Sequence, residues 1–131
     1  MNCLVDTHII IWPLLDSPKL SADARNVLSS KTDIFYYSMA SVWEVGIKHD
    51  LLKEDFSIGA RDFADFASKT GYRLLNISVE HVEALSSLKK LSNHNDPFDR
   101  LMIAQAKIEG MKFITHDGLL SGYGESCIYN V

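Results

Sequence analysis

The chain has 131 residues, of which 47% are hydrophobic and 23% are charged. This length suits one domain with a core that needs no metal or disulfide staple, so we expect a single domain over residues 1–131. The formal net charge of −4 argues against a protein that holds nucleic acid by charge alone, because such proteins are normally basic. This charge does not exclude a nuclease, since metal ions can supply positive charge at the reacting phosphate.

The cysteines and the N-terminus favour a cytoplasmic protein. Cys3 and Cys127 lie near opposite ends of the sequence, without CxxC or Cys/His ligand spacing, so we expect reduced thiols and no zinc site. No basic residue precedes the first apolar run and Asp6 interrupts it, which is unlike a signal peptide. The longest apolar run, Ile9 to Leu15, is too short to span a bilayer.

Strand and helix signals alternate through the first half of the chain. Residues 2–6 predict a strand, and the apolar residues 7–16 predict a helix that Pro13 should bend or end. Residues 21–30 predict a helix with one polar face. A strand rich in aromatic and β-branched residues is expected at residues 33–37.

The alternation continues after the second strand. Residues 38–52 and 58–69 predict helices, the second of them ending near Gly71. A strand at residues 72–77 is followed by helical spacing over residues 79–91.

A polar loop at residues 93–96 precedes the clearest helix, residues 97–109, which has proline in its first turn and glycine just past its end. Strands at residues 111–115 and 127–131 complete the pattern. Such alternation implies a mostly parallel sheet with helices on both faces. Ligands of these sheets bind beyond the carboxyl ends of the strands, so function is expected just after each strand.

Four acidic residues fit this rule, each in a different segment. They are Asp6 after the first strand, Glu44 two turns into the helix after the second, Asp99 in the first turn of the helix 97–109, and Asp117 after the fourth strand. Converging carboxylates repel one another unless a cation neutralises them. Mg²⁺ suits such a site because it takes oxygen ligands. Hydrolysis with one metal ion and hydrolysis with two are both compatible with this sequence.

Two of these acids also have a structural interpretation at the start of a helix. Asp6 could cap the helix that follows it. It lies between the apolar segments CLV and IIIW, where an unpaired acid is costly, and this favours a function. Glu44 could complete a capping box with Ser41 as N-cap, and that interpretation has equal weight.

The other acids have similar alternatives. Asp96 precedes Pro97 and is a good N-cap, and Asp99 suits the positive end of the same helix. Asp117 before Gly118 is a common turn pair. Each signal alone is weak, whereas the joint placement of the acids points to a metal site.

Four segments together resemble the PIN domain, in particular its VapC-like branch with a DPFDR segment. They are LVDTHIIIW, SVWEVGIKH, HNDPFDRLMIAQA and FITHDGLLSGYG, in order from Leu4 to about Gly124. The resemblance implies a three-layer α/β/α sandwich and an endoribonuclease that depends on Mg²⁺ or Mn²⁺. It also implies a homodimeric toxin that a cognate, VapB-like antitoxin with a basic C-terminal segment neutralises.

The same resemblance assigns the site residues. Asp6, Glu44, Asp99 and Asp117 match the acidic quartet that holds the metal and carries out catalysis.

Five further residues are candidates for supporting roles, namely Thr7, Ser38, Asp96, Arg100 and His116. Thr7 and Ser38 match the small hydroxyl positions beside the quartet. Arg100 suits a phosphate contact or a surface salt bridge equally well. His116 stands where arginine is frequent, which leaves a substrate contact uncharged at neutral pH.

The remaining histidines and tryptophans favour packing roles. His8, His81 and His94 share no metal-ligand spacing and are expected to be surface or packing residues. Trp12 and Trp43 could stack on bases, but core packing is the better interpretation for most of the aromatic residues.

Two other classes of function have less support in the sequence. A phosphotransfer enzyme of the haloacid-dehalogenase type resembles DxDxT, but here Thr7 and His8 follow Asp6 and the second acid is missing. Loss of members of the acidic quartet would favour a degenerate PIN scaffold that only binds proteins. Here the quartet is complete. Walker A, GxGxxG and GxSxG motifs are absent, so nucleotide-cofactor and serine-hydrolase functions lack support.

Overall fold

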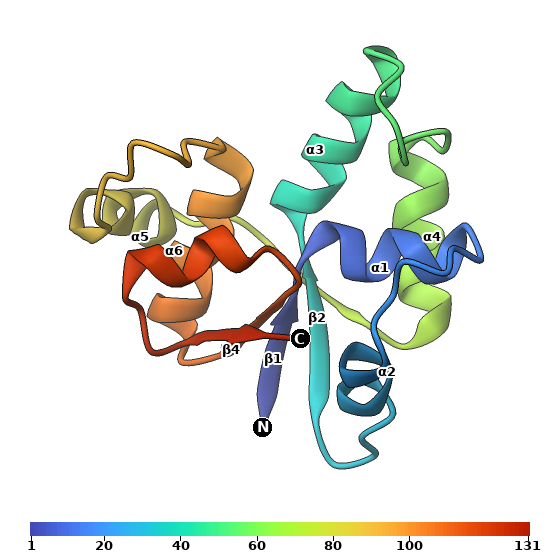
Figure 1. Cartoon of the computed structure of the whole chain (residues 1–131), viewed down its shortest axis with the longest axis horizontal. Coiled ribbons are helices and arrows are strands. Elements are labelled where there is room, and N and C mark those ends of the chain that lie inside the picture. The colour runs from blue at the N-terminus through green and yellow to red at the C-terminus, as the bar shows by residue number, and fades with distance from the viewer.

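Five strands form one parallel sheet. The computed structural model describes residues 1–131, and the strands lie in the order β3-β2-β1-β4-β5 (Figure 1). Their bounds are β1 Asn2–Val5, β2 Ile34–Ser38, β3 Arg73–Leu75, β4 Lys112–Thr115 and β5 Ile128–Asn130. All neighbouring strands are parallel, so their carboxyl ends lie at one edge of the sheet. The predicted parallel sheet is confirmed.

Helices cover both faces of this sheet. They are α1 Thr7–Leu14, α2 Ala22–Leu28, α3 Met39–Asp50, α4 Ala60–Thr70, α5 Val79–Glu83 and α6 Pro97–Glu109, with the 3₁₀ helices η1 Ala84–Ser87 and η2 Gly118–Tyr123. In Figure 1, α1, α2 and α4 lie on one side of the sheet, and α5 and α6 lie on the other. The expected three-layer α/β/α sandwich is confirmed. Every helix is too short or too polar to cross a membrane.

The central strand β1 explains why two hydrophobic cores form. Cys3 and Val5 belong to the core shared with α1, α2 and α4, whereas Leu4 belongs to the core shared with α6. All three side chains are at most 2% exposed. Because side chains alternate across a strand, a run of apolar residues buries both faces at once. The two cysteines are free thiols, as expected.

Local sequence signals fix the ends of α6 as predicted. Asp96 caps the helix by accepting hydrogen bonds from the backbone amides of Phe98 at 2.9 Å and Asp99 at 3.2 Å. Pro97 is the first helical residue, where its missing amide costs nothing. Gly110 ends the helix in the left-handed conformation with a φ of 67°.

The predicted helix over residues 79–91 is wrong beyond Ser87. The chain forms α5 and then η1, after which Leu88 is extended. The guanidinium of Arg100 donates to the carbonyl oxygens of Leu85 at 3.4 Å and Lys89 at 2.8 Å. These contacts come from α6, and periodicity within the segment could not reveal them.

Candidate metal centre

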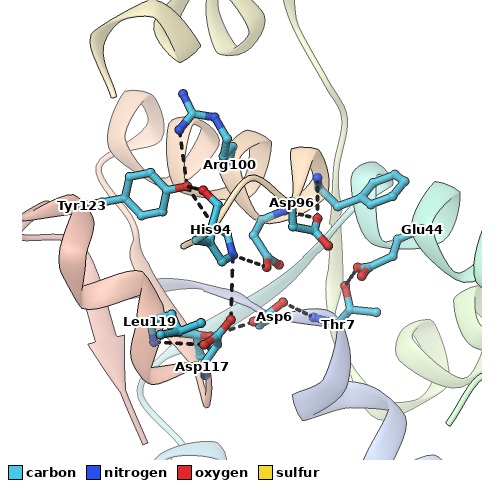
Figure 2. A network of polar contacts seen from close by, with 12 residues as sticks. Asp6, Thr7, Glu44, His94, Asp96, Arg100, Asp117, Leu119 and Tyr123 are labelled. Carbon is cyan, nitrogen blue, oxygen red and sulfur yellow. Dashed lines mark hydrogen bonds and ion pairs between the residues drawn. The ribbon is translucent and has the colours of Figure 1, made fainter. Parts of the chain in front are cut away.

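The four acidic side chains predicted from the sequence meet at the carboxyl edge of the sheet. Asp6 follows β1 and Asp117 follows β4, while Glu44 lies on α3 and Asp99 on α6. Figure 2 shows Asp6, Glu44 and Asp117 around the same space, together with His94. The charges of the other three acids all act on the carboxyl group of Asp99. The four side chains therefore form one electrostatic site.

Asp6 is fixed by hydrogen bonds from both neighbouring segments. Its carboxylate accepts from the backbone amide of Thr7 and from the hydroxyl of Thr115, each at 2.7 Å. The Thr115 oxygen also accepts from the backbone amide of Asp117 at 3.1 Å. Thr115, the last residue of β4, thus links two acids by hydrogen bonds, a role that no sequence motif indicates. Asp6 is also the N-cap of α1, so the capping and site interpretations are compatible.

Glu44 is buried and held by a hydroxyl group. The side chain is 2% exposed, and the Thr7 hydroxyl donates to one of its oxygens at 2.5 Å. The same Thr7 oxygen lies 2.8 Å from the hydroxyl of Ser41. The capping-box interpretation is wrong, because Ser38 is the N-cap of α3 and Glu44 lies beyond the first turn. The position of Glu44 is instead set by its contacts across the site.

Lys48 is the cation that contacts this acidic cluster. Its ammonium group lies 2.5 Å from Glu44 and 3.6 Å from Asp96, above the rings of Phe56 and Phe98. Burial alone would lower the pKa of Lys48, but the hydrogen bond to Glu44 and the surrounding carboxylates raise it. The ammonium group therefore stays charged and balances part of the acidic charge.

The two aspartates of the DPFDR region have different tasks. Asp96 uses one carboxylate oxygen to cap α6. Asp99 lies one turn later with its side chain 15% exposed, and its Oδ2 atom is 3.0 Å from Nε2 of His94. Asp99 rather than Asp96 therefore points its carboxylate at the other site residues.

His94 is a buried packing residue, as expected, and its imidazole also contacts the acidic cluster. Its Nε2 atom lies 3.0 Å from Asp99 and 3.8 Å from Asp117, and the residue is 8% exposed. Its Nδ1 atom lies 2.8 Å from the hydroxyl of Tyr123, which also donates to the His94 carbonyl oxygen at 3.3 Å. Arg100 donates to the same hydroxyl at 3.3 Å and lies over the Tyr123 ring. The imidazole is therefore held in one orientation toward two carboxylates.

Burial and mutual repulsion raise the pKa of two acids. Burial raises the pKa of Asp6 to about 7, although the hydrogen bond from Thr115 opposes the shift. Burial also raises the pKa of Asp99 to about 9, with further repulsion from Asp6 and Asp96. The residues of the chain alone therefore leave an excess of negative charge, and a bound cation would relieve it.

Three of the expected supporting residues do not contact the acidic quartet. Ser38 caps α3 and donates to Gln105 at 2.5 Å, whereas the hydroxyl group that contacts Glu44 is that of Thr7. Arg100 forms no salt bridge and is engaged by carbonyl oxygens and Tyr123. His116 is exposed and contacts Val131 and Trp12.

The donor atoms fit a divalent cation. Potential ligand atoms of His94, Asp99 and Asp117 lie within 4.8 Å of one another. Ligands on an octahedral ion at about 2.1 Å lie about 3 Å apart when adjacent and about 4.2 Å apart when opposite, so these spacings need only small adjustments. A nitrogen among carboxylate oxygens suits Mn²⁺ better than Mg²⁺, which prefers oxygen ligands.

Solved structures share this fold over almost the whole chain. A VapBC2 complex from Rickettsia felis bound to promoter DNA has a TM-score of 0.73 at 16% identity and covers 100% of this chain and 99% of the other. FitAcB from Neisseria gonorrhoeae has a TM-score of 0.67 at 18% identity and covers 98% of this chain and 96% of its own. VapC20 from Mycobacterium tuberculosis is described as a toxin that cleaves the sarcin–ricin loop. It has a TM-score of 0.64 at 17% identity, and the match covers 93% of this chain and 95% of VapC20. Among curated proteins, none matches this sequence.

The family follows from the sequence match together with the fold. A family model described as the PIN domain matches residues 3–125, which include all four acids and His94. The parallel sheet and the acidic residues at its carboxyl edge agree with that match. The chain therefore belongs to the PIN domain family.

Proposed function

We propose that this PIN-domain protein is a metal-dependent endoribonuclease and acts as a VapC-type toxin. The observation that carries the proposal is the convergence of Asp6, Asp99 and Asp117 with the imidazole of His94. Similarity in fold to VapC20, which is described as an RNA-cleaving toxin, supports the choice of RNA as substrate. The overall charge of −4 fits an enzyme whose affinity for phosphate depends on a bound cation.

The metal site is proposed to contain the acidic quartet, with Asp6 and Asp99 as its chief ligands. When bound, Mg²⁺ or Mn²⁺ would activate a water molecule and neutralise the phosphate oxygens during hydrolysis. Thr7 and Thr115 orient the carboxylates of Glu44 and Asp6 by hydrogen bonding. Lys48 offsets the charge of Glu44, whose second oxygen it occupies, and thereby limits repulsion within the site.

A cleavage assay with a conservative substitution tests this function. Asp6→Asn should abolish cleavage of single-stranded RNA in Mn²⁺ or Mg²⁺, because it removes a charged ligand while keeping the shape of the side chain. Asp62→Asn is the matched control and should retain activity. Asp62 is an exposed residue of α4, a helix that carries none of the site residues. Full activity of the Asp6 variant, or wild-type cleavage in excess EDTA, would refute the proposal.

The second candidate is a PIN scaffold that has lost catalysis and serves as a protein-binding module. The same assay separates the two, because a binding module would cleave no RNA in either metal. The complete acidic quartet and the buried Thr7–Glu44 hydrogen bond favour the enzyme.

An antitoxin partner forms part of the proposal. The solved structures with a similar fold include toxin–antitoxin complexes from Klebsiella pneumoniae and Rickettsia felis. The acidic charge at this site would attract a basic, partly disordered segment of a cognate antitoxin. By analogy with the VapC-like branch, we also propose that the toxin is a homodimer.

A further inference from the structure

A pocket adjoins the candidate metal centre on the side of α1. It has a volume of about 240 Å³ and is lined by Asp6, His8, Trp12, His116 and Asp117, a set that we call the His–Trp pocket. Asp6 and Asp117 line the pocket and also belong to the acidic site. A molecule held at the metal would therefore extend directly into this space.

The walls of the His–Trp pocket are aromatic and held in place. The Trp12 ring lies 5.4 Å from the ring of His8, tilted by 43°, and 5.4 Å from that of His116, at 81°. Trp12 is only 8% exposed, and its indole nitrogen donates to Asp55 at 3.3 Å. Phe56 packs edge-on against His8, with the ring centres 5.4 Å apart. These rings form a preorganised surface for a flat ligand.

The polar atoms of the pocket select the chemistry of that ligand. Nδ1 of His116 lies 2.7 Å from the main-chain oxygen of Val131, which can only accept, so Nδ1 carries a proton. No hydrogen bond within the chain occupies Nε2, which is left for a polar atom of the ligand. His8 makes no hydrogen bond within the chain, and the two carboxylates repel any anionic group. The pocket therefore suits a flat, uncharged ring with polar atoms on its edge.

We propose that the His–Trp pocket binds one unstacked nucleobase of single-stranded RNA beside the phosphodiester bond that is cleaved. This inference rests on the proposed nuclease function and adds a base subsite to it. The phosphate lies at the acids while the neighbouring base enters between His8 and His116, against Trp12. Bases in unpaired RNA are free to turn outward and stack on aromatic side chains. The pocket thus helps to determine which bond is cut.

Abasic substitution tests the subsite. After the cleaved bond of a short single-stranded RNA is mapped, each base is removed in turn while the ribose–phosphate chain is kept. Removal of one base beside the cut should lower kcat/KM for the wild type by about fivefold or more, the range expected for loss of one base–aromatic stack. Equal effects at all positions, or no effect at any, would overturn the inference.

Two variants of the exposed His116 separate stacking from hydrogen bonding without disturbing the core. His116→Ala should cleave intact RNA more slowly and lose sensitivity to the critical abasic position. His116→Phe keeps an aromatic ring and should keep that sensitivity. Tyr129→Ala, which removes an exposed aromatic residue of β5, is the control and should behave like the wild type. Unchanged sensitivity in His116→Ala would also overturn the inference.

A fluorescence readout keeps this inference separate from the proposed function. If the wild type cleaves no RNA, the nuclease proposal fails, and RNAs carrying 2-aminopurine at single positions then report on the pocket alone. Quenching at one position that His116→Ala abolishes would support a base subsite. Uniform or absent quenching, or a His116 variant that weakens only antitoxin binding, would show that the pocket does not hold a base.

Discussion

At the scale of single residues, His94 changes the expected composition of the site. The ligands predicted from the acidic residues alone are all oxygen atoms. The structure adds the imidazole nitrogen of His94, which lies 3.0 Å from Asp99. Histidines that bind metal usually have their second nitrogen engaged by a fixed partner, and Tyr123 supplies that contact here. His94 therefore has the environment of a metal ligand.

Replacing His94 should weaken Mn²⁺ binding. His94→Gln is expected to lower Mn²⁺ affinity by about tenfold or more, because a nitrogen ligand is lost from the site. Pulsed electron paramagnetic resonance of Mn²⁺-loaded wild type should show coupling to a histidine nitrogen, and this coupling should vanish in the variant. His81→Gln, which changes a buried histidine paired with Glu109, is the control. Mn²⁺ bound to the wild type without nitrogen coupling would contradict this assignment.

At the scale of elements, the N-terminal turn of α6 divides two tasks between two carboxylates. Asp96 satisfies the free amides at the start of the helix, and the helix geometry then turns Asp99 toward the acids that follow β1 and β4. The cap and the proposed ligand are three residues apart, so a substitution can affect one task without the other.

The two carboxylates should respond differently to the same substitution. Asp96→Asn should change the free energy of unfolding by less than about 0.5 kcal/mol, because asparagine caps nearly as well as aspartate, and should largely preserve RNA cleavage. Asp99→Asn should lose cleavage while remaining folded. Chemical denaturation and a cleavage assay on both variants measure this contrast. The reverse pattern would mean that Asp96 is the essential carboxylate.

At the scale of the whole molecule, the acidic site makes stability depend on pH. In metal-free protein the pKa of Asp6 is raised to about 7 and that of Asp99 to about 9, from 3.8. Carboxyl groups with raised pKa bind protons more tightly in the folded than in the unfolded chain. The folded state is therefore favoured at low pH and loses stability as the pH rises from about 4 toward 9.

This linkage predicts the behaviour of the metal-free protein in EDTA. The free energy of unfolding should fall between pH 5.5 and 8.5 by at least about 1.4 kcal/mol, the equivalent of one pKa unit. Asp99→Asn should be more stable than the wild type at pH 8.5 and show a flatter pH dependence. Urea denaturation at the two pH values measures both effects. A wild type that gains stability toward pH 8.5, with no difference from the variant, would contradict the assigned charges.

The proposed antitoxin should compete with metal for the same acids. An arginine or lysine from its basic segment would lie among the carboxylates, while neighbouring apolar residues supply most of the affinity from an adjacent groove. Titration calorimetry with the antitoxin segment should show weaker binding in saturating Mn²⁺ and only modest weakening by added salt. Equal affinity with and without Mn²⁺ would indicate inhibition from another surface.

The sequence by itself determined the parallel α/β/α architecture and the chain segments that carry the acids. Alternating apolar runs and helix-cap residues act over a few neighbouring positions, so they can be recognised without knowledge of the fold. The roles of His94, Lys48 and Thr115 were decided only by tertiary structure, because their contacts join residues from separate segments. The contacts of Arg100 of α6 with the carbonyl groups of Leu85 and Lys89, around the end of the helical residues 79–87, likewise join separate segments. Periodicity records which face of an element is buried, whereas the partner of a buried polar group depends on how the elements pack.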